Sequence, residues 1–542
     1  MKIKILGFLL ITTLTIAFCG NVTGQEIKMD WGKSFESKNE ISKIIGVQDN
    51  IMYAIASKKK DDFLVGYDEN TLTEKFSRQI QLPKNTTMLD IVLTKGGPTL
   101  IYFSHSNKNK DLNVSAKILG KLGNKNTVKS LMKVSDDAKV RGNILDIKES
   151  ADKKNYLVYY TRSLVLSGRK RKVITEFVTF DYALKSINQF EHNNSGNIDE
   201  NGFVSNADIK IDKNKNILYV LPVFSGDQGK YELFIKQYDM RGKSLNENFI
   251  DTKGTYVGQP KIFLDNKTGE FRVVGLSVGM DENRLGYTGV YSAVIEGNTL
   301  KEKSSFNTIF PIDFLKKFLR GKSVDRKAQK GKSIYVPGTY SINNVFVTED
   351  GSIVFTAEDY YNFMVESSQF SSTEQWIFGN VICGKLNSGG ELKWINIAKK
   401  TQIASKTRPK VALGTGGGGG LSVGASFTIG SKLPAECSNY SYLAGIANNT
   451  LVLIYNDHIK LSDRDAETGK SKALRDPKKS LVYKYTFDLE TGESKRTALI
   501  KESNQGGTYL APKVFFRNDD NSIIVWGRYK KTQKFGHLIF SN

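Results

Sequence analysis

The sequence has few of the residues that build redox, metal or membrane sites. Its 542 residues include three cysteines, four histidines and four tryptophans. No HExxH or paired-histidine spacing occurs, and no CxxC pair, so neither a metal site nor a redox centre is predicted. Beyond residue 24, no segment is long and apolar enough to form a membrane-spanning helix. We therefore expect no metal, no cofactor and no transmembrane segment.

Proline is also scarce, whereas glycine and aromatic residues are abundant. The chain has 10 prolines against 48 glycines, 24 tyrosines and 30 phenylalanines, and 39% of its residues are hydrophobic. A composition this apolar excludes an intrinsically disordered protein. Glycine in turns, combined with tyrosine and phenylalanine in strands, is typical of an all-β protein.

One stretch, Asp208–Ile250, shows the unit from which the chain is built. It reads as four short runs of β-forming residues separated by polar or glycine-bearing turns. Four antiparallel strands in about 45 residues correspond to one blade of a β-propeller.

The same pattern of two tight turns per unit recurs along the chain. A polar turn between the first two strands occurs eight times, and an outer hairpin turn follows the first seven of them. The inner turns are Asp49-Asn50, Gly96-Gly97, Asp152–Asn155, Asp212–Asn216, Asn266–Gly269, Asp350-Gly351, Asn448-Asn449 and Asp519–Asn521. The outer turns lie near Asp68, Gly120–Gly123, Asp181, Asp239, Glu296-Gly297, Asn387–Gly390 and Asp488–Gly492.

The eighth unit ends after a third strand, Lys534–Phe540, and lacks an outer strand of its own. The segment Glu26–Phe35 resembles the outer strand that contains Trp394, so it is a suitable fourth strand. Pairing the N-terminal strand into the last blade closes the ring, because every sheet edge is then covered. The prediction is an eight-bladed, four-stranded antiparallel propeller over residues 25–542.

Two long insertions interrupt the spacing, at about 310–340 and 398–440. The first begins with Pro311–Arg320, one short amphipathic helix. Its apolar stripe is compatible with a membrane surface or a partner helix, but we expect it to pack on its own domain. Neither insertion is expected to carry a core of its own. Because turns two strands apart face the same way, these insertions and the loops 358–375 and 456–479 should share one face. Loops on a rigid scaffold commonly bind ligands, so this long-loop face is the functional candidate.

Residues 1–24 read as a signal peptide. Lys2 and Lys4 precede an apolar run, Ile5–Phe18, and cleavage after Gly24 would leave Gln25 as the first residue. Cys19 is the basis of a rival interpretation, a lipoprotein, although Phe18 is large for the position before a lipidated cysteine. The protein is expected to be exported to the periplasm, the envelope or the medium. The sequence leaves open whether Cys383 and Cys437 form a disulfide.

The chain is strongly basic, with 78 Lys and Arg against 56 Asp and Glu, a net charge of +22. The stretch Lys316–Lys332 is especially rich in lysine and arginine. Such a surface suits an anionic partner, for example a polysaccharide, but it is also compatible with a merely solvated face. The export signal and the absence of a reader motif argue against nucleic acid.

Six residues on the long-loop face are candidate ligand contacts. Tyr360, Tyr361 and Phe363 lie in one predicted loop, with Trp376 beyond it, and such aromatic faces stack on carbohydrate or peptide ligands. The same rings are equally suited to covering the insertions from inside. Asp457 and His458 adjoin another long loop, but no GxSxG motif or reactive cysteine accompanies them. No catalytic residue is predicted.

Two stretches, Phe378–Trp394 and Leu451–His458, are similar to segments of uncharacterised exported proteins of Bacteroidota-type bacteria. This resemblance implies an envelope or secreted location and no particular activity. The preferred functional hypothesis is a non-enzymatic binding or scaffold protein for an anionic glycan or an envelope protein. The alternative is a glycan-active hydrolase or lyase, which would need two suitably spaced carboxylates.

Overall fold

The structure is a computed structural model, and it describes most of the chain between Ile27 and Phe540. The described ranges are 27–36, 39–58, 61–106, 111–119, 128–135, 140–150, 152–165, 171–194, 207–225, 230–265, 267–281, 284–319, 321–368, 371–409, 427–429, 437–461, 472–499, 508–517, 522–529 and 531–540. The predicted signal peptide with Cys19 and the turns Gly120–Gly123 and Asp519–Asn521 lie outside these residues.

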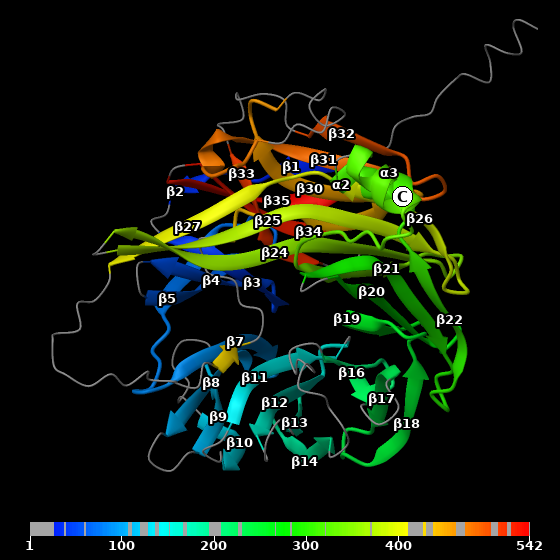
Figure 1. The fold of residues 1–542 in the computed structure, drawn as a ribbon. Coiled ribbons are helices and arrows are strands. Elements are labelled where there is room, and N and C mark those ends of the chain that lie inside the picture. The colour runs from blue at the N-terminus through cyan, green and yellow to red at the C-terminus, as the bar shows by residue number, and fades with distance from the viewer. Residues whose placement is uncertain are drawn as a thin grey trace, which may run out of the picture.

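Eight antiparallel sheets follow one another around a ring, which confirms the predicted eight-bladed propeller (Figure 1). Blade 1 consists of β3 (Glu40–Gln48), β4 (Ile51–Lys58), β5 (Asp61–Asp68) and β6 (Glu74–Gln79), and blade 2 of β7 (Thr87–Thr94), β8 (Gly97–Ser106), β9 (Asp111–Ile118) and β10 (Val128–Ser135). Blade 3 consists of β11 (Val140–Glu149), β12 (Asn155–Val165), β13 (Arg171–Asp181) and β14 (Ser186–Asn194). Blade 4 consists of β15 (Asp208–Ile211), β16 (Ile217–Ser225), β17 (Lys230–Tyr238) and β18 (Ser244–Asp251).

The next three blades follow the same order from the innermost to the outermost strand. Blade 5 consists of β19 (Tyr256–Leu264), β20 (Phe271–Asp281), β21 (Arg284–Ile295) and β22 (Glu302–Ile309). Blade 6 consists of β23 (Tyr340–Val347), β24 (Ile353–Ser368), β25 (Ser371–Leu386) and β26 (Leu392–Ala398), and blade 7 of β29 (Leu443–Ala447), β30 (Thr450–His458), β31 (Ser480–Asp488) and β32 (Ser494–Ala498).

Blade 8 is assembled from both ends of the described chain, as the sequence predicts. Its inner strands are β33 (Tyr509–Arg517), β34 (Ile523–Tyr529) and β35 (Thr532–Ile539), and β1 (Lys28–Trp31) and β2 (Phe35–Glu36) pair with β35. The Trp31 ring lies across two glycines of the blade. A Cβ atom on Gly527 would lie 2.6 Å from this ring, and one on Gly536 would lie 2.8 Å from it. The closing strand is therefore fixed by side-chain packing as well as by backbone pairing.

The predicted turns that fall within the described residues are the tight connections of the blades. Asp49 and Asn50 join β3 to β4 with φ values of 53° and 58°, and Asn448 and Asn449 join β29 to β30 with φ values of 37° and 57°. Asparagine and aspartate tolerate the left-handed backbone that a two-residue hairpin requires. Local turn chemistry thus explains why the repeat is visible in the sequence.

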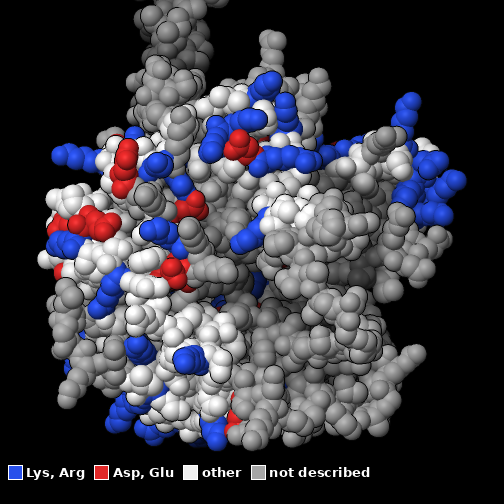
Figure 2. Space-filling model, turned by 90° about the vertical axis from the view of Figure 1, so that its left-hand side faces the viewer, with Lys and Arg blue, Asp and Glu red and all other residues white. Residues whose placement is uncertain are grey.

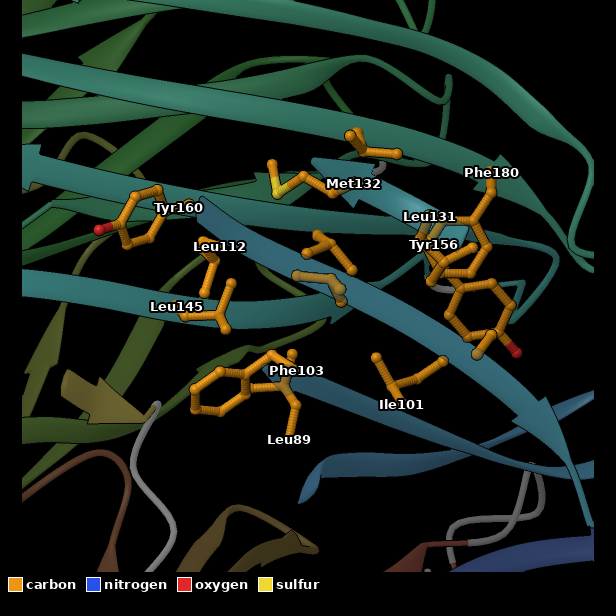
Figure 3. Packing of buried hydrophobic residues seen from close by; sticks show 14 of the residues in the cluster. Leu89, Ile101, Phe103, Leu112, Leu131, Met132, Leu145, Tyr156, Tyr160 and Phe180 are labelled. Carbon is orange, nitrogen blue, oxygen red and sulfur yellow. The ribbon is translucent and has the colours of Figure 1, made fainter. Parts of the chain in front are cut away.

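The hydrophobic core is divided into layers that lie between neighbouring blades. In the layer between blades 2 and 3, Phe103 and Leu112 of blade 2 pack against Leu145 and Tyr156 of blade 3 (Figure 3). Seven further clusters occupy the other seven junctions, including that between blades 8 and 1. Each blade is accordingly buried on both faces, and stability depends on contacts between blades.

A recurring hydrogen bond also links successive blades near their outer edge. A side chain on the outermost strand of one blade donates to a backbone carbonyl in or beside the outer turn of the next blade. The six donor–acceptor pairs are Arg78–Leu119, Lys129–Leu184, Asn188–Arg241, Asn248–Leu300, Ser304–Gly389 and Asn396–Gly492.

The two insertions differ from the sequence-based expectation. The first contains α2 (Ile312–Phe318) and also a second helix, α3 (Gly321–Gln329), where only one helix was predicted. The second insertion adds β27 (Gln402–Pro409) to blade 6, and β28 (Phe427–Ile429) pairs in parallel with β11 of blade 3. The predicted loop 358–375 is wrong. Those residues continue β24 and β25 as a long hairpin that projects from blade 6, toward the left in Figure 1.

Candidate functional site

The long hairpin and β27 form a three-stranded sheet that we call the extension, comprising residues 360–368, 371–378 and 402–409. Within it, β25 is the central strand. Trp376 pairs with Asn362 on one side and with Ala404 on the other. Because directly opposed residues share a face of a sheet, this register assigns each side chain of the extension to one of two faces.

The inner face of the extension packs on a small cluster of buried hydrophobic side chains. Trp376 is only 2% exposed and lies in a cluster with Phe378, Ala404, Cys437, Tyr440 and Leu474, against which Tyr360 packs. The Tyr360 and Phe378 ring centroids are 5.0 Å apart. Trp376 is therefore a core residue and is not exposed on the surface of the extension. The second insertion supplies Ala404, Cys437 and Tyr440 to this cluster, which it shares with β24, β25 and Leu474.

The outer face of the extension carries the aromatic residues that remain exposed. Tyr361 and Phe363 are 40% and 38% exposed, and their rings stack with centroids 6.1 Å apart. Val365 follows on the same face with 38% exposure. The residues that share this face through the pairing register are all uncharged: Thr373, Gln375, Ile377, Ile403, Ser405 and Thr407. An uncharged face with two adjacent rings is unusual on a chain of net charge +22.

A buried polar network holds the base of the extension to the propeller. Lys400 Nζ donates to Glu358 Oε1 at 2.6 Å, and both side chains are almost fully buried. Ser441 Oγ donates to the other Glu358 oxygen, Oε2, at 2.6 Å. Burial lowers the pKa of Lys400, and the nearby Glu358 carboxylate opposes that shift. This ion pair joins β24 to the start of the second insertion.

Gln402 extends the network into blade 7. Its side-chain oxygen accepts from Lys400 Nζ at 3.2 Å and from the Ser441 backbone N–H at 2.6 Å. Its Nε2 donates to the Asn456 carbonyl at 2.6 Å. This network is not predicted from the sequence. Glu358 directly follows the apolar run Ile353–Ala357, and a charged residue at the end of a buried strand indicates a buried polar contact. The network thus ties β24, the second insertion and blade 7 together.

Asp457 and His458 lie in β30, and the structure gives them roles that do not support catalysis. Arg496 Nη2 donates to Asp457 Oδ2 at 2.9 Å, with both groups about 3% exposed. Burial raises the pKa of Asp457 to about 6, while Arg496 pulls it in the opposite direction. Asp457 Oδ1 accepts the backbone N–H of His458, not a ring nitrogen.

The His458 ring faces a backbone group. Its Nδ1 accepts the Lys460 N–H at 3.1 Å, and burial lowers the pKa of the imidazole. Asp457 and His458 therefore do not form a carboxylate–imidazole pair of the kind that general-base catalysis uses. The prediction that both residues contact a ligand stays untested.

The helical insertion carries several exposed basic side chains. Phe314 and Leu315 of α2 and Val324 of α3 are buried, as expected for a helix that packs on its own domain. Lys316 forms an ion pair with Asp325 at 2.8 Å, and Lys322, Arg326, Lys330 and Lys332 are exposed. On the side of the molecule toward which the extension projects, lysine and arginine are also more widespread than aspartate and glutamate (Figure 2).

Metal, disulfide and membrane chemistry can be addressed for the described residues. Among them, no group of three or more His, Cys, Asp or Glu side chains is placed to hold a metal ion. No disulfide joins Cys383 and Cys437, which are both buried. None of the helices in this part of the chain has the length and hydropathy that a membrane crossing requires.

Comparison with known proteins supports the fold and goes no further. The sequence matches no protein-family model and no curated protein sequence. Solved β-propellers are similar in shape. The Dos1 propeller has a TM-score of 0.38 at 8% identity, with 95% of this chain and 96% of that chain covered. The WD40 domain of SCAP from fission yeast has a TM-score of 0.32 at 9% identity, covering 95% and 96%.

Several of the similar structures are enzymes, among them the polysaccharide lyase Uly1. Its TM-score is 0.35 at 10% identity, with 96% of this chain and 94% of that chain covered. The order of the eight sheets identifies the chain as a β-propeller, and likeness at this level assigns no activity, because one fold hosts many functions. The resemblance to uncharacterised exported proteins stays a prediction.

Proposed function

We propose that this protein is an exported, non-enzymatic binding protein of the cell envelope, and that the outer face of its extension binds an anionic glycan. The observation that carries the proposal is the exposed, stacked pair Tyr361 and Phe363 on a sheet face without charged residues. Aromatic rings of this kind offer apolar area with little loss of conformational entropy, and they suit the apolar faces of sugar rings.

The construction of the extension supports a rigid binding platform. Trp376 anchors the inner face, and the Glu358–Lys400 pair fixes the base, so the exposed rings are carried on pre-organised strands. A pre-organised site avoids much of the ordering cost of binding. The uncharged polar groups beside the rings, such as Gln375 and Ser405, are suitable hydrogen-bonding partners for sugar hydroxyls.

The charge of the chain supports an anionic polymer as the partner. Lysine and arginine are more widespread than aspartate and glutamate on the side toward which the extension projects (Figure 2), and the net charge is +22. Such a field increases the rate of encounter with a polyanion and weakens as salt is added. Export and an envelope location rest on residues 1–24, which have the pattern of a signal peptide.

Affinity electrophoresis would test this proposal. The protein is run through native gels that contain polygalacturonate, with dextran as the uncharged comparison. Polygalacturonate should retard the wild type, and the Tyr361→Ala/Phe363→Ala variant should bind at least about tenfold more weakly because two stacking surfaces are lost. Phe249→Ala is the matched control, since Phe249 is a 54% exposed phenylalanine on an outer strand of blade 4.

The same gels separate the competing interpretations. Equal retardation of the wild type and the double variant would refute the role of the extension face. Release of unsaturated or reducing-end products during incubation would favour the lyase or hydrolase alternative. Retardation by neither polysaccharide would refute the glycan proposal and would leave a protein partner as the candidate to test.

A further inference from the structure

The junction between blades 4 and 5 contains a pocket on the tight-turn face, away from the extension. Its volume is about 300 Å³, at the lower end of the range for small-molecule sites. The side chains that line it come from turns and strand ends of both blades. They include Asn214, Asn216, Gln237, Asn246, Asn298 and Phe271.

A short side chain at the outer edge of blade 4 contributes to this pocket. Asn246 pairs with Gln237, the last residue but one of β17. At the matching register of blade 6, Trp394 pairs with Lys385. The Trp394 indole covers the outer turn of blade 7, where its Nε1 donates to the Leu489 carbonyl at 2.9 Å. Asn246 is too short to cover the neighbouring turn in this way.

The lining of the pocket is polar but uncharged. It presents five carboxamide side chains and includes no lysine, arginine, aspartate or glutamate. Gln237 is about 95% buried, and its Oε1 accepts from Asn246 Nδ2 at 3.2 Å. Asn216 Nδ2 donates to Asp212 Oδ2 at 3.2 Å, which orients that amide. A carboxamide carries both a donor and an acceptor, so it can engage a hydroxyl group in either sense.

Apolar groups form the remainder of the wall. Phe271 is buried, and Leu245 and Leu264 stand beside it. Gly297 lets the two turns of blade 5 approach closely beside the pocket, since a Cβ atom on it would lie 2.0 Å from the Gly269 carbonyl oxygen. The pocket therefore combines an apolar surface, several neutral hydrogen-bonding groups and the absence of charge.

We infer that this pocket is a second binding site, for a neutral sugar ring or a closely similar uncharged polyol. Such a molecule presents apolar C–H groups to the phenylalanine and leucine side, and hydroxyl groups to the carboxamides. A charged ligand is disfavoured because no lining residue compensates the loss of its hydration. The site does not depend on the extension, and it goes beyond the glycan-binding function proposed for that face.

Saturation-transfer NMR would test the inference with methyl glucoside, galactose, mannose and N-acetylglucosamine as neutral probes and glucuronate as the charged comparison. At least one neutral probe should receive saturation from the wild type. Asn246→Trp, which introduces the residue that blade 6 has at this register, should abolish that signal or weaken binding at least tenfold. Gln237→Met removes a carboxamide at similar volume and should also weaken binding about tenfold.

Two controls make the result interpretable. Asn70→Trp introduces the same side chain at an exposed position in the outer turn of blade 1 and should bind as the wild type does. Tyr361→Ala/Phe363→Ala should also keep the signal, which separates this site from the extension. Thermal melting verifies that Asn246→Trp is folded. The inference is overturned if no neutral probe binds, if Asn246→Trp binds normally, or if glucuronate is preferred.

Discussion

The buried Glu358–Lys400 pair offers the sharpest test of how the extension is held. Lys400→Met keeps an unbranched side chain of similar length and removes the positive charge. It leaves the Glu358 carboxylate about 2% exposed, with Ser441 and Asn343 as remaining hydrogen-bond donors. Breaking a buried pair by removing one partner commonly costs about 3 to 5 kcal/mol, because the other charge stays buried. Lys513 Nζ remains 3.9 Å from Glu358 Oε2 in the variant, so we expect the lower end of this range, about 3 kcal/mol.

Lys385→Met is the matched control for this change. The Lys385 side chain is also buried, at 7% exposure, but its partner Glu490 is 69% exposed and can be solvated once the lysine is gone. We expect Lys385→Met to cost about 1 kcal/mol or less. The double variant Lys400→Met/Glu358→Met removes both buried charges and should recover most of the loss, as apolar replacements of buried pairs often do.

Hydrogen exchange is the appropriate assay, because the pair fixes one part of a large protein. Amides of β27, which follows Lys400 directly, should exchange about 100-fold faster in Lys400→Met, since about 3 kcal/mol corresponds to that factor. Lys385→Met should leave β27 protection unchanged. If Lys400→Met exchanges like the wild type, or if the double variant is no better protected than Lys400→Met, the pair does not hold the extension in place.

Three further predictions concern other parts of the molecule. Burial raises the pKa of Asp457 from 3.8 to about 6. Deprotonation of this buried group should therefore lower the free energy of unfolding by about 3 kcal/mol as the pH rises from about 4 through 6. The difference in unfolding free energy between the wild type and Asp457→Asn should change across that range, and parallel stability curves would contradict the assignment. Deleting residues 27–36 should expose the edge of β35 and cause aggregation measurable by light scattering, whereas a monomeric, stable deletion variant would refute the closure. Mass spectrometry of the mature protein should find Gln25 as its first residue, and an acylated Cys19 would establish the lipoprotein instead.

Much of the fold was predictable because its signals are local. Turns such as Asp49-Asn50 and Asn448-Asn449 depend on residues that adopt left-handed backbone, and these residues are visible without any tertiary information. The closing strand was also predictable, since an incomplete last unit and a strand-like segment before the first unit complement each other.

The candidate site was only partly predictable, because burial there depends on which distant segments meet. Tyr361 and Phe363 are exposed as the binding hypothesis requires, but Trp376 is covered by Tyr440 and Leu474, far away in sequence. From the sequence we predict a loop over Tyr360–Val365, although the composition of this run favours a strand. The helix α3 was missed because it has a single buried apolar residue, Val324, and hence little periodicity.

The hydrogen bonds between outer strands and outer turns all run in one direction around the ring. Blades 2 to 6 each donate one such bond forward and accept one from behind, regardless of whether the donor is lysine, asparagine or serine. A whole blade copied within the gene would arrive with both halves of the linkage already in place. A propeller built in this way can therefore gain or lose a blade by duplication or deletion and still form this hydrogen bond between each outer strand and the next outer turn. The number of blades can change in evolution while the contact between blades stays the same.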